Sequence, residues 1–251
     1  MNAARVIPVL AVALSLFGSV AGAVDCQDME FDGQSYTICE TDSAREDLRL
    51  FLRDDQDQIL GQFSRVDATL EQSGETLIFA MNAGMYHFDR QPVGHYLENG
   101  IRQKPVIEGA SPGNFGLLPN GVFCIGDRVA RVYETHRYLA DRPDCRFATQ
   151  SGPMLVIDGA LHPRFLIDST SRFIRNGVGT SDSGDRVVFA ISNERVTFHD
   201  FGRLFRDGLK LPQALYFDGK VSRLYAPALQ RHDPGLPLGP IVGIVVPKQT
   251  E

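Results

Sequence analysis

Five strand-like segments of this chain end in small polar turns whose side chains could build a binding site. Each segment is apolar at first and then places Asn, Ser, Arg or Asp beside glycine, which permits positive φ angles and close backbone approach. Polar groups held at strand ends by a rigid scaffold commonly line a pocket. We therefore expect a convergent site of amides, one arginine and one carboxylate. The five segments are residues 79–84, 114–121, 148–153, 173–179 and 214–219.

The segment 173–179 predicts an anion site. Arg175 precedes two closely spaced glycines, Gly177 and Gly179. A guanidinium fork beside exposed backbone N–H groups suits a phosphate or a carboxylate. The alternative for Arg175 is an internal salt bridge, and the glycine spacing matches neither a P-loop nor a dinucleotide-binding fingerprint.

The carboxylate of Asp218 ends an apolar run and precedes Gly219. This is a natural position for a catalytic base or nucleophile that is partly shielded yet reaches a cleft. An ordinary Asp-Gly turn is the competing interpretation. Glu98 is a second candidate carboxylate, or else a solvated hairpin residue.

The remaining polar candidates favour substrate binding over hydrolysis by a serine nucleophile. Asn82 follows a nearly all-apolar run and could bind a sugar hydroxyl or satisfy loop backbone groups. Ser151 lies in Thr-Gln-Ser-Gly-Pro, which lacks the G-x-S-x-G context of a nucleophile elbow. The six histidines show no H-E-x-x-H or H-x-H spacing, so a catalytic triad is disfavoured.

The N-terminus predicts export. Arg5 precedes an apolar run over residues 6–17, and residues 21–23 read Ala-Gly-Ala, an A-x-A cleavage pattern. This is typical of a signal peptide over residues 1–23, and the apolar run is short for a spanning helix. Residues 24–251 then form the mature chain, with a periplasmic or secreted location and no further membrane segment.

Cysteine count and charge agree with an exported protein that does not bind nucleic acid. An even number of cysteines in an exported chain favours disulfides, and four allow three pairings. Pairs 26–39 and 124–145 would each close a local loop, and the absence of zinc-type spacing argues against metal ligation. The formal net charge of −6 argues against a nucleic-acid partner. The four residues are Cys26, Cys39, Cys124 and Cys145.

Short strands dominate the pattern. Helices are expected over residues 64–72, capped by Ser64, and after Asp200, which we expect to cap the helix. Hairpins are expected at 122–133 and 186–198, and an Asp-Gly turn follows the strand at 154–157. We predict one α+β domain with a mixed, largely antiparallel sheet and a few helices. The other expected strands are 48–52, 76–81, 214–217 and 241–246.

The order of these segments resembles the phosphodiester glycosidase family, in particular an exported bacterial branch. The shared segments are residues 79–86, 92–94, 114–115, 119–123, 148–153, 174–179, 189–192, 214–219 and 224–227. The resemblance implies hydrolysis of a sugar–phosphate glycosidic bond such as that of a GlcNAc-1-phosphodiester. It marks as site positions Asn82, Gly84, Asn114, Ser151, Gly152, Arg175, Asn176, Gly177, Asp218 and Gly219.

Two residues depart from the family pattern, and His95, which stands where an apolar residue is expected, is the smaller departure. Lys220 follows Asp218-Gly219, where the family carries small residues. Its cation could reinforce phosphate binding or exclude the usual substrate.

The expected mechanism needs no cofactor. Arg175 and the Gly177 and Gly179 backbone would hold the phosphate, while Asp218 acts as base or nucleophile, with Glu98 as a possible partner. The substrate is a glycan phosphodiester, whose hydroxyls Asn82, Asn114, Ser151 and Asn176 would orient. Two alternatives use the same pocket. One is a non-catalytic binder of envelope glycans, and the other is a hydrolase that holds Ca²⁺ or Mg²⁺ between Asp218 and Asp182 or Glu98.

Overall fold

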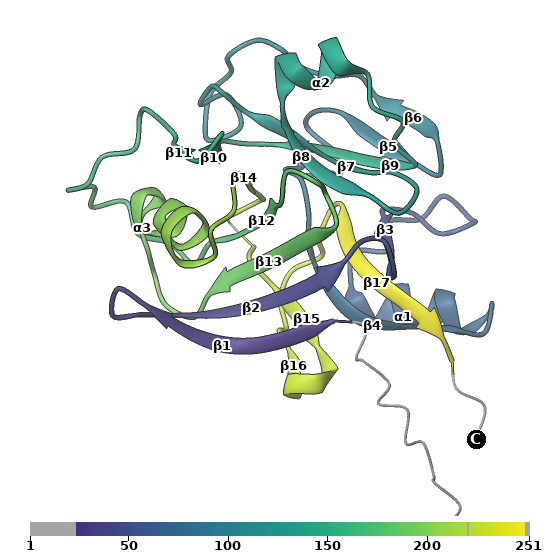
Figure 1. Cartoon of the computed structure of the whole chain (residues 1–251). Helices are drawn as coiled ribbons and strands as arrows, with labels where there is room; N and C mark the ends of the chain where they lie inside the picture. The colour runs from purple at the N-terminus through teal and green to yellow at the C-terminus, as the bar shows by residue number, and fades with distance from the viewer. Residues whose placement is uncertain (1–23, 220, 249–251) are drawn as a thin grey trace, which may run out of the picture.

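The computed structural model describes residues 24–219 and 221–248, so the predicted signal peptide lies outside the described residues. The chain forms three β-sheets and three short helices (Figure 1). Every strand pairing in the described part is antiparallel. The prediction of an α+β fold with largely antiparallel sheet is therefore confirmed. The parallel pairs that a mixed sheet would contain are absent from the described residues. No helix among these residues is long and apolar enough to cross a membrane.

Each sheet combines strands from distant parts of the sequence. The seven-stranded sheet runs, in spatial order, β1 (Asp25–Phe31), β2 (Gln34–Asp42), β13 (Arg186–Ser192), β12 (Asn176–Thr180), β14 (Gln213–Tyr216), β10 (Met154–Ile157) and β11 (Ala160–Leu161). One five-stranded sheet runs β16 (Arg231–His232), β15 (Leu224–Ala226), β4 (Glu75–Asn82), β17 (Ile241–Pro247) and β3 (Asp47–Phe51). The other runs β6 (Ile101–Lys104), β5 (Tyr96–Glu98), β9 (Phe147–Ser151), β7 (Gly121–Ile125) and β8 (Ala130–Glu134).

The three α-helices are α1 (Phe63–Glu71), α2 (Thr135–Asp141) and α3 (Phe198–Arg203). Helix α3 continues as a π-helical turn over Leu204–Gly208, and a 3₁₀ turn spans Pro227–Leu229. The helix expected at 64–72 is confirmed, but its predicted cap is wrong. Ser64 lies inside α1, and Gln62 precedes the helix without a side-chain capping bond.

The expected hairpin at 186–198 is wrong at its second strand. Val196 makes only an isolated bridge to Phe173. Thr197 instead caps α3, and its hydroxyl accepts a hydrogen bond from the Asp200 N–H, while the Asp200 carboxylate accepts one from the Thr197 N–H. Asp200 is therefore the third residue of a capping box rather than the cap, because the reciprocal bonds satisfy two free N–H groups of the first turn.

One core joins the three sheets. Phe189 of β13 packs against Phe79 of β4 and Phe123 of β7, with ring centroids 4.8 and 6.0 Å apart. All three rings are fully buried in one continuous cluster. A shared core of this kind makes the sheets one folding unit, as the single-domain prediction requires.

Two disulfides are present, and they are the two local pairs. Cys26 and Cys39 lie opposite each other in the β1–β2 ladder. Cys124 of β7 is joined to Cys145, which precedes β9. The described residues contain no free cysteine.

Candidate functional site

Asp218 lies where the chain passes from the seven-stranded sheet to a five-stranded sheet. β14 ends at Tyr216, and the next strand along the chain, β15, pairs with β4 of the other sheet. The Phe217 N–H donates to the Asn176 carbonyl at 3.1 Å, and the Asp218 N–H donates to the Ala83 carbonyl at 3.2 Å. Backbone bonds to both sheets therefore hold Asp218 in place.

Two buried asparagines form a polar clasp beneath Asp218. The Asn82 amide donates to the Asp218 carbonyl at 2.8 Å and to Asn176 Oδ1 at 3.3 Å. The Asn176 amide donates back to the Asn82 carbonyl at 3.0 Å, and Asn82 Oδ1 accepts from the Arg223 N–H at 2.9 Å. Both side chains are fully buried. The structure brings these predicted residues together, but as supports of the Asp218 turn rather than as pocket lining.

Asp218 lines a pocket of about 640 Å³. Among the described residues it is the only acid in the lining, and no lysine or arginine lines the pocket there. Of the other predicted site residues, Asn114 and Gly219 also line it. The rest of the wall is mostly apolar and aromatic: Met85, Tyr86, Val93, Ile107, Phe115 and Phe173.

Tyr216 is a pocket residue that the sequence interpretation missed. It is buried, it lines the pocket, and its hydroxyl lies against Gly219, where a Cβ would come within 1.3 Å of the hydroxyl oxygen. Its pKa is raised to about 12, mainly by burial, while the charge of Arg175 lowers it and that of Asp218 raises it. Tyr216 is therefore a neutral hydrogen-bond donor at neutral pH. Its only signal in the sequence was its place within the segment 214–219.

Arg175 lies behind Tyr216 rather than in the pocket wall. It is 1% exposed, its Nε donates to the Val196 carbonyl at 2.9 Å, and its Nη2 donates to the Ser171 carbonyl at 3.0 Å. Its guanidinium carbon lies 3.6 Å from the centre of the Phe198 ring and 5.4 Å from that of Tyr216. The alternative interpretation, an internal salt bridge, is not found among the described residues, and the predicted contact between Arg175 and a ligand in this pocket is not supported by the packing.

Arg175 is a buried cation whose charge is opposed by burial. Burial lowers its pKa, and the nearby Tyr216 hydroxyl opposes that change. Nη1 makes no hydrogen bond of normal geometry to any described residue. The Tyr216 hydroxyl is thus a polar group close to this buried guanidinium.

The expected phosphate-binding bend at Gly177 and Gly179 is not a bend. Both glycines lie inside β12, which pairs with β13 on one side and β14 on the other. A Cβ at Gly177 would lie 2.5 Å from the Leu215 carbonyl oxygen, and one at Gly179 would lie 2.7 Å from the Phe205 ring. These positions need glycine because neighbouring groups approach closely, and their backbone groups serve the sheet.

Tyr86 is a second aromatic residue that was missed as a site candidate. It lines the pocket, and its hydroxyl is buried without a hydrogen-bond partner in the described chain. Burial, and then the charge of Asp218, raise its pKa to about 12. Tyr86 and Tyr216 thus provide two neutral hydroxyls near the Asp218 carboxylate.

The segment 148–153 supports the pocket from outside. Gln150 of β9 holds the pocket loop by accepting from the Ile107 N–H at 2.9 Å and donating to the Ile107 carbonyl at 2.7 Å. Ser151 is fully buried, its hydroxyl has no partner among the described residues, and it is not in the pocket lining. Gly84 and Gly152 are required by close packing. A Cβ atom at Gly84 would clash with the Thr149 side chain, and one at Gly152 would clash with the Asn120 side chain.

Two expected partners of Asp218 lie elsewhere. Glu98 lines a separate pocket with Arg49 and Arg146 and accepts a hydrogen bond from the Tyr96 hydroxyl at 2.8 Å. Asp182 lines another pocket, near β8. Neither carboxylate lines the Asp218 pocket, so the pairing of either with Asp218 is not supported. Lys220 lies outside the described residues.

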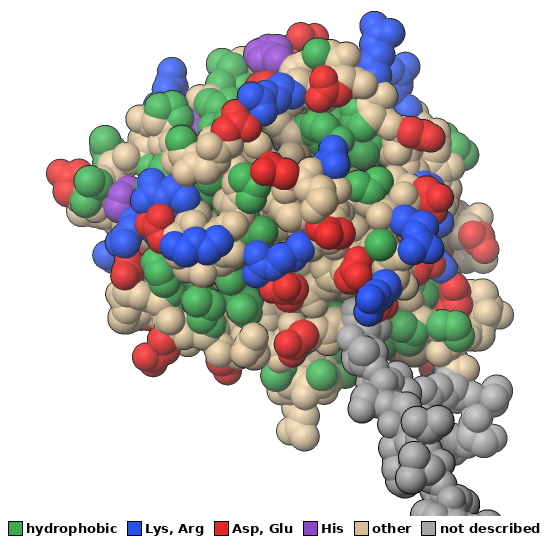
Figure 2. Space-filling model, viewed as in Figure 1, with side chains coloured by type: hydrophobic (Ala, Val, Ile, Leu, Met, Phe, Trp, Pro, Cys, Tyr) green, Lys and Arg blue, Asp and Glu red, His purple; other side chains and the backbone are tan. Residues whose placement is uncertain are grey.

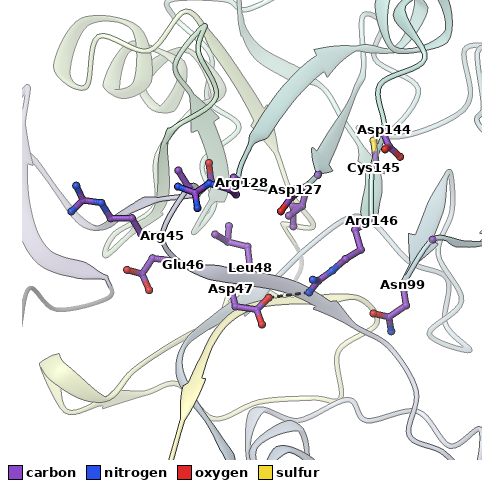
Figure 3. A pocket seen from close by; sticks show the side chains of 15 residues that line it. Arg45, Glu46, Asp47, Leu48, Asn99, Asp127, Arg128, Asp144, Cys145 and Arg146 are labelled. Carbon is purple, nitrogen blue, oxygen red and sulfur yellow. Dashed lines mark hydrogen bonds and ion pairs between the residues drawn. The ribbon is translucent and has the colours of Figure 1, made fainter.

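A pocket of about 470 Å³ beside β3 carries mixed charges (Figure 3). Arg146 donates to the Asp47 carboxylate at 2.9 Å, and Arg45, Glu46 and Arg128 also line this pocket. It contains no residue predicted for the site. No group of three or more potential metal ligands occurs anywhere in the described part of the chain.

The sequence of this chain matches a known protein family. A family model described as phosphodiester glycosidase matches residues 75–236, which include Asp218, its asparagine clasp and the pocket wall. The uncharacterized protein YigE of Escherichia coli (strain K12) is 31% identical over 217 residues, covering 84% of this chain and 81% of YigE.

Two solved structures share the fold. The catalytic domain of zebrafish N-acetylglucosamine-1-phosphodiester alpha-N-acetylglucosaminidase, auto-inhibited by its pro-peptide, has a TM-score of 0.61 at 12% identity, over 90% of this chain and 85% of that chain. A hypothetical protein from Synechocystis has a TM-score of 0.58 at 10% identity, over 88% of this chain and 61% of that chain. At these identities the likeness concerns the fold alone. Because the family model spans well over half of the chain, this protein belongs to the phosphodiester glycosidase family.

Proposed function

We propose that this chain is an exported hydrolase that cleaves the bond between the anomeric carbon of a sugar and a phosphodiester. The substrate class is a GlcNAc-1-phosphodiester or a related envelope glycan. The observation that carries the proposal is the placement of Asp218 as the only acid in the described pocket lining, within the segment that matches the family. The two disulfides favour an oxidising compartment, which agrees with the periplasm or the exterior.

In the proposed reaction, Asp218 removes a proton from a water molecule whose oxygen attacks the anomeric carbon. The bond from that carbon to the phosphate oxygen breaks, its electrons stay on that oxygen, and the products are a free sugar and a phosphate monoester. A phosphate leaves with its own negative charge, so it needs less help from a general acid than an alcohol does. One carboxylate is therefore sufficient, in contrast to the paired carboxylates of most glycosidases.

The pocket supports this reaction with neutral hydrogen-bond donors. The Tyr86 and Tyr216 hydroxyls keep their protons at neutral pH, because burial raises the pKa of each to about 12. We place Tyr216 against the leaving phosphate oxygens, with the buried charge of Arg175 behind it. Preorganised donors of this kind commonly contribute a factor of about 100 to 1,000 in rate. Asn114 and the aromatic wall would bind the sugar.

The test is turnover of a GlcNAc-1-phosphodiester or its nitrophenyl analogue by wild-type protein and by Asp218→Asn. We expect the variant to lose at least about 100-fold in kcat with an unchanged circular dichroism spectrum. Asp182→Asn is the matched control, because it removes an exposed carboxylate outside this pocket. Full activity of Asp218→Asn would remove Asp218 from the mechanism. Glycan binding without turnover by the wild type would favour a binding protein, and loss of activity with a chelator would favour a metal-dependent hydrolase.

A further inference from the structure

The wall loop, defined here as residues 107–115, forms the largest share of the Asp218 pocket wall. It supplies six of the fourteen residues that line the pocket, and it contains neither helix nor strand. Residues 108–114 are exposed, and no hydrogen bond joins residues 108–113 to any other described part of the chain. The shape of this wall therefore depends on how the two ends of the loop are held. The six lining residues are Ile107, Ser111, Pro112, Gly113, Asn114 and Phe115.

Both ends of the wall loop are held by one buried chain of hydrogen bonds. The Gln150 amide donates to the Ile107 carbonyl at 2.7 Å and to the Thr135 hydroxyl at 3.2 Å. That hydroxyl donates to Asn120 Oδ1 at 2.7 Å, and the Asn120 amide donates to the Phe115 carbonyl at 3.0 Å. Four hydrogen bonds in series thus connect the first residue of the loop to the last.

Thr135 is the middle of this chain and the first residue of α2, which packs against β7 and β8 (Figure 1). The N–H of a first helical residue has no partner inside its helix, and that of Thr135 donates to the Asn120 carbonyl at 3.1 Å. Thr135 and Gln150 are each 1% exposed, and Asn120 is fully buried. Buried polar groups depend on one another, because water cannot replace a lost partner. Loss of the Thr135 hydroxyl would therefore break the chain at its centre and take one hydrogen bond from each of two buried amides.

The wall loop offers neutral groups to a ligand. Ser111 provides a hydroxyl, Asn114 provides an amide, and two further residues, Ile107 and Phe115, provide apolar surface. The one ionisable residue of the loop, Glu108, does not line the pocket. On the face seen in Figure 2, acidic and basic side chains are interspersed, so the described residues there form no continuous patch of one sign that would steer an anion from a distance. Neutral hydrogen-bonding groups beside apolar surface suit the hydroxyls and C–H faces of a sugar.

We propose that Thr135 is a positioning residue of the pocket, whose hydroxyl fixes the wall loop in the form that binds the sugar end of the substrate. Thr135 does not line the pocket, and the Asp218 carboxylate lies on another segment, so the loop governs affinity rather than the chemical step. If only a tenth of the molecules keep the binding form without the hydroxyl, the apparent affinity falls about tenfold, while saturating ligand restores that form. That the ligand is a sugar rests on the proposed function; the hold on the loop does not.

The test compares three variants with the wild type in turnover of a GlcNAc-1-phosphodiester. Thr135→Val keeps the shape of the side chain and removes the hydroxyl, so KM should rise about tenfold while kcat stays within about twofold of the wild-type value. Thr135→Ser keeps the hydroxyl and should restore KM. Thr180→Val is the matched control, because Thr180 is also fully buried and its hydroxyl accepts from the Val132 N–H at 3.1 Å, away from the pocket lining. This control should lose stability and keep the wild-type KM.

A wild-type KM in Thr135→Val, or an equal rise in KM in Thr180→Val, would overturn the positioning role and leave the hydrolysis standing. Two further measurements need no turnover. The Ile107 amide, which donates to Gln150 at 2.9 Å, should exchange its hydrogen about tenfold faster in Thr135→Val alone, as followed by NMR. Titration with N-acetylglucosamine 1-phosphate should show about tenfold weaker binding by the same variant. Both changes in a protein that never hydrolyses the phosphodiester would support the role of Thr135 and contradict the proposed function, whereas unchanged exchange and binding would overturn that role.

Discussion

The side-chain amide of Asn82 donates a 2.8 Å hydrogen bond to the backbone carbonyl of Asp218, although 136 residues separate them in sequence. The same amide contacts Asn176, and its oxygen accepts from the Arg223 N–H. The position of the proposed catalytic carboxylate therefore depends on one buried side chain that does not itself reach the pocket.

Replacing Asn82 by alanine should lower both stability and activity. The change leaves the Asp218 carbonyl and the Arg223 N–H without their partner in a buried environment, which costs about 1–3 kcal/mol for each unsatisfied group. Chemical denaturation measures the loss in the free energy of unfolding, and turnover is compared below the transition. Gln103→Ala on β6 is the control, because that amide is exposed. An Asn82→Ala protein as stable and active as the wild type would show that the clasp does not position Asp218.

Removing the Tyr216 hydroxyl should slow the reaction without unfolding the protein. Tyr216→Phe keeps the buried ring and deletes the hydroxyl, so we expect kcat to fall by about tenfold or more, while loss of the polar neighbour of Arg175 lowers Tm without unfolding the protein at the assay temperature. Because the pKa of Tyr216 is raised to about 12, the hydroxyl stays protonated between pH 6 and 9, and the loss should be the same factor throughout that range. Tyr133→Phe, on β8 and outside the pocket lining, should have no effect. A loss that varies with pH in this range would contradict a neutral donor.

The glycine at position 177 should prove to be a packing residue. In Gly177→Ala the new Cβ would meet the Leu215 carbonyl oxygen at 2.5 Å, so β12 and β14 must move apart. Overpacking of this kind costs about 1–3 kcal/mol, which thermal and denaturant unfolding would detect. Gly109→Ala is the matched control, since nothing lies within 4 Å of its Cβ position. If Gly177→Ala kept full stability and lost sugar-phosphate binding, the original interpretation of a phosphate-binding bend would be restored.

Glu98 should make the protein less stable as the pH rises. Burial raises its pKa from 4.5 to about 7 in the folded state, while the hydrogen bond from Tyr96 acts in the opposite direction. The folded state therefore binds more protons than the unfolded state between these two values, and the free energy of unfolding falls with rising pH in that window.

Glu98→Gln removes this titration and keeps a group that can accept from Tyr96. The wild type should lose on the order of 2 kcal/mol relative to the variant between pH 4.5 and pH 7, because each pKa unit corresponds to about 1.4 kcal/mol. Denaturant unfolding at several pH values measures the difference. Parallel stability curves for the two proteins would show that Glu98 has an ordinary pKa.

Much of the local structure was readable from the sequence. Apolar runs bounded by turn residues located β4, β7, β10, β13 and β17, and the Asp158-Gly159 dipeptide forms the β10–β11 turn with positive φ at both residues. Exposed or short strands were missed. The β1–β2 hairpin has polar residues at most positions of its outer strand, so its apolar periodicity is weak.

Sequence by itself determined the family and supplied two expectations, export and Asp218 as the candidate carboxylate, because these rest on residue types in a given order. Only the tertiary structure decided which polar groups face the pocket. Asn82, Asn176 and Arg175 have the residue types of ligand-binding side chains, yet their hydrogen bonds go to groups contributed by distant segments. Tyr86 and Tyr216 have the residue types of core aromatics, yet they line the pocket. A buried polar atom takes whichever partner the assembled sheets place opposite it, and that partner is not encoded in the local spacing of residues.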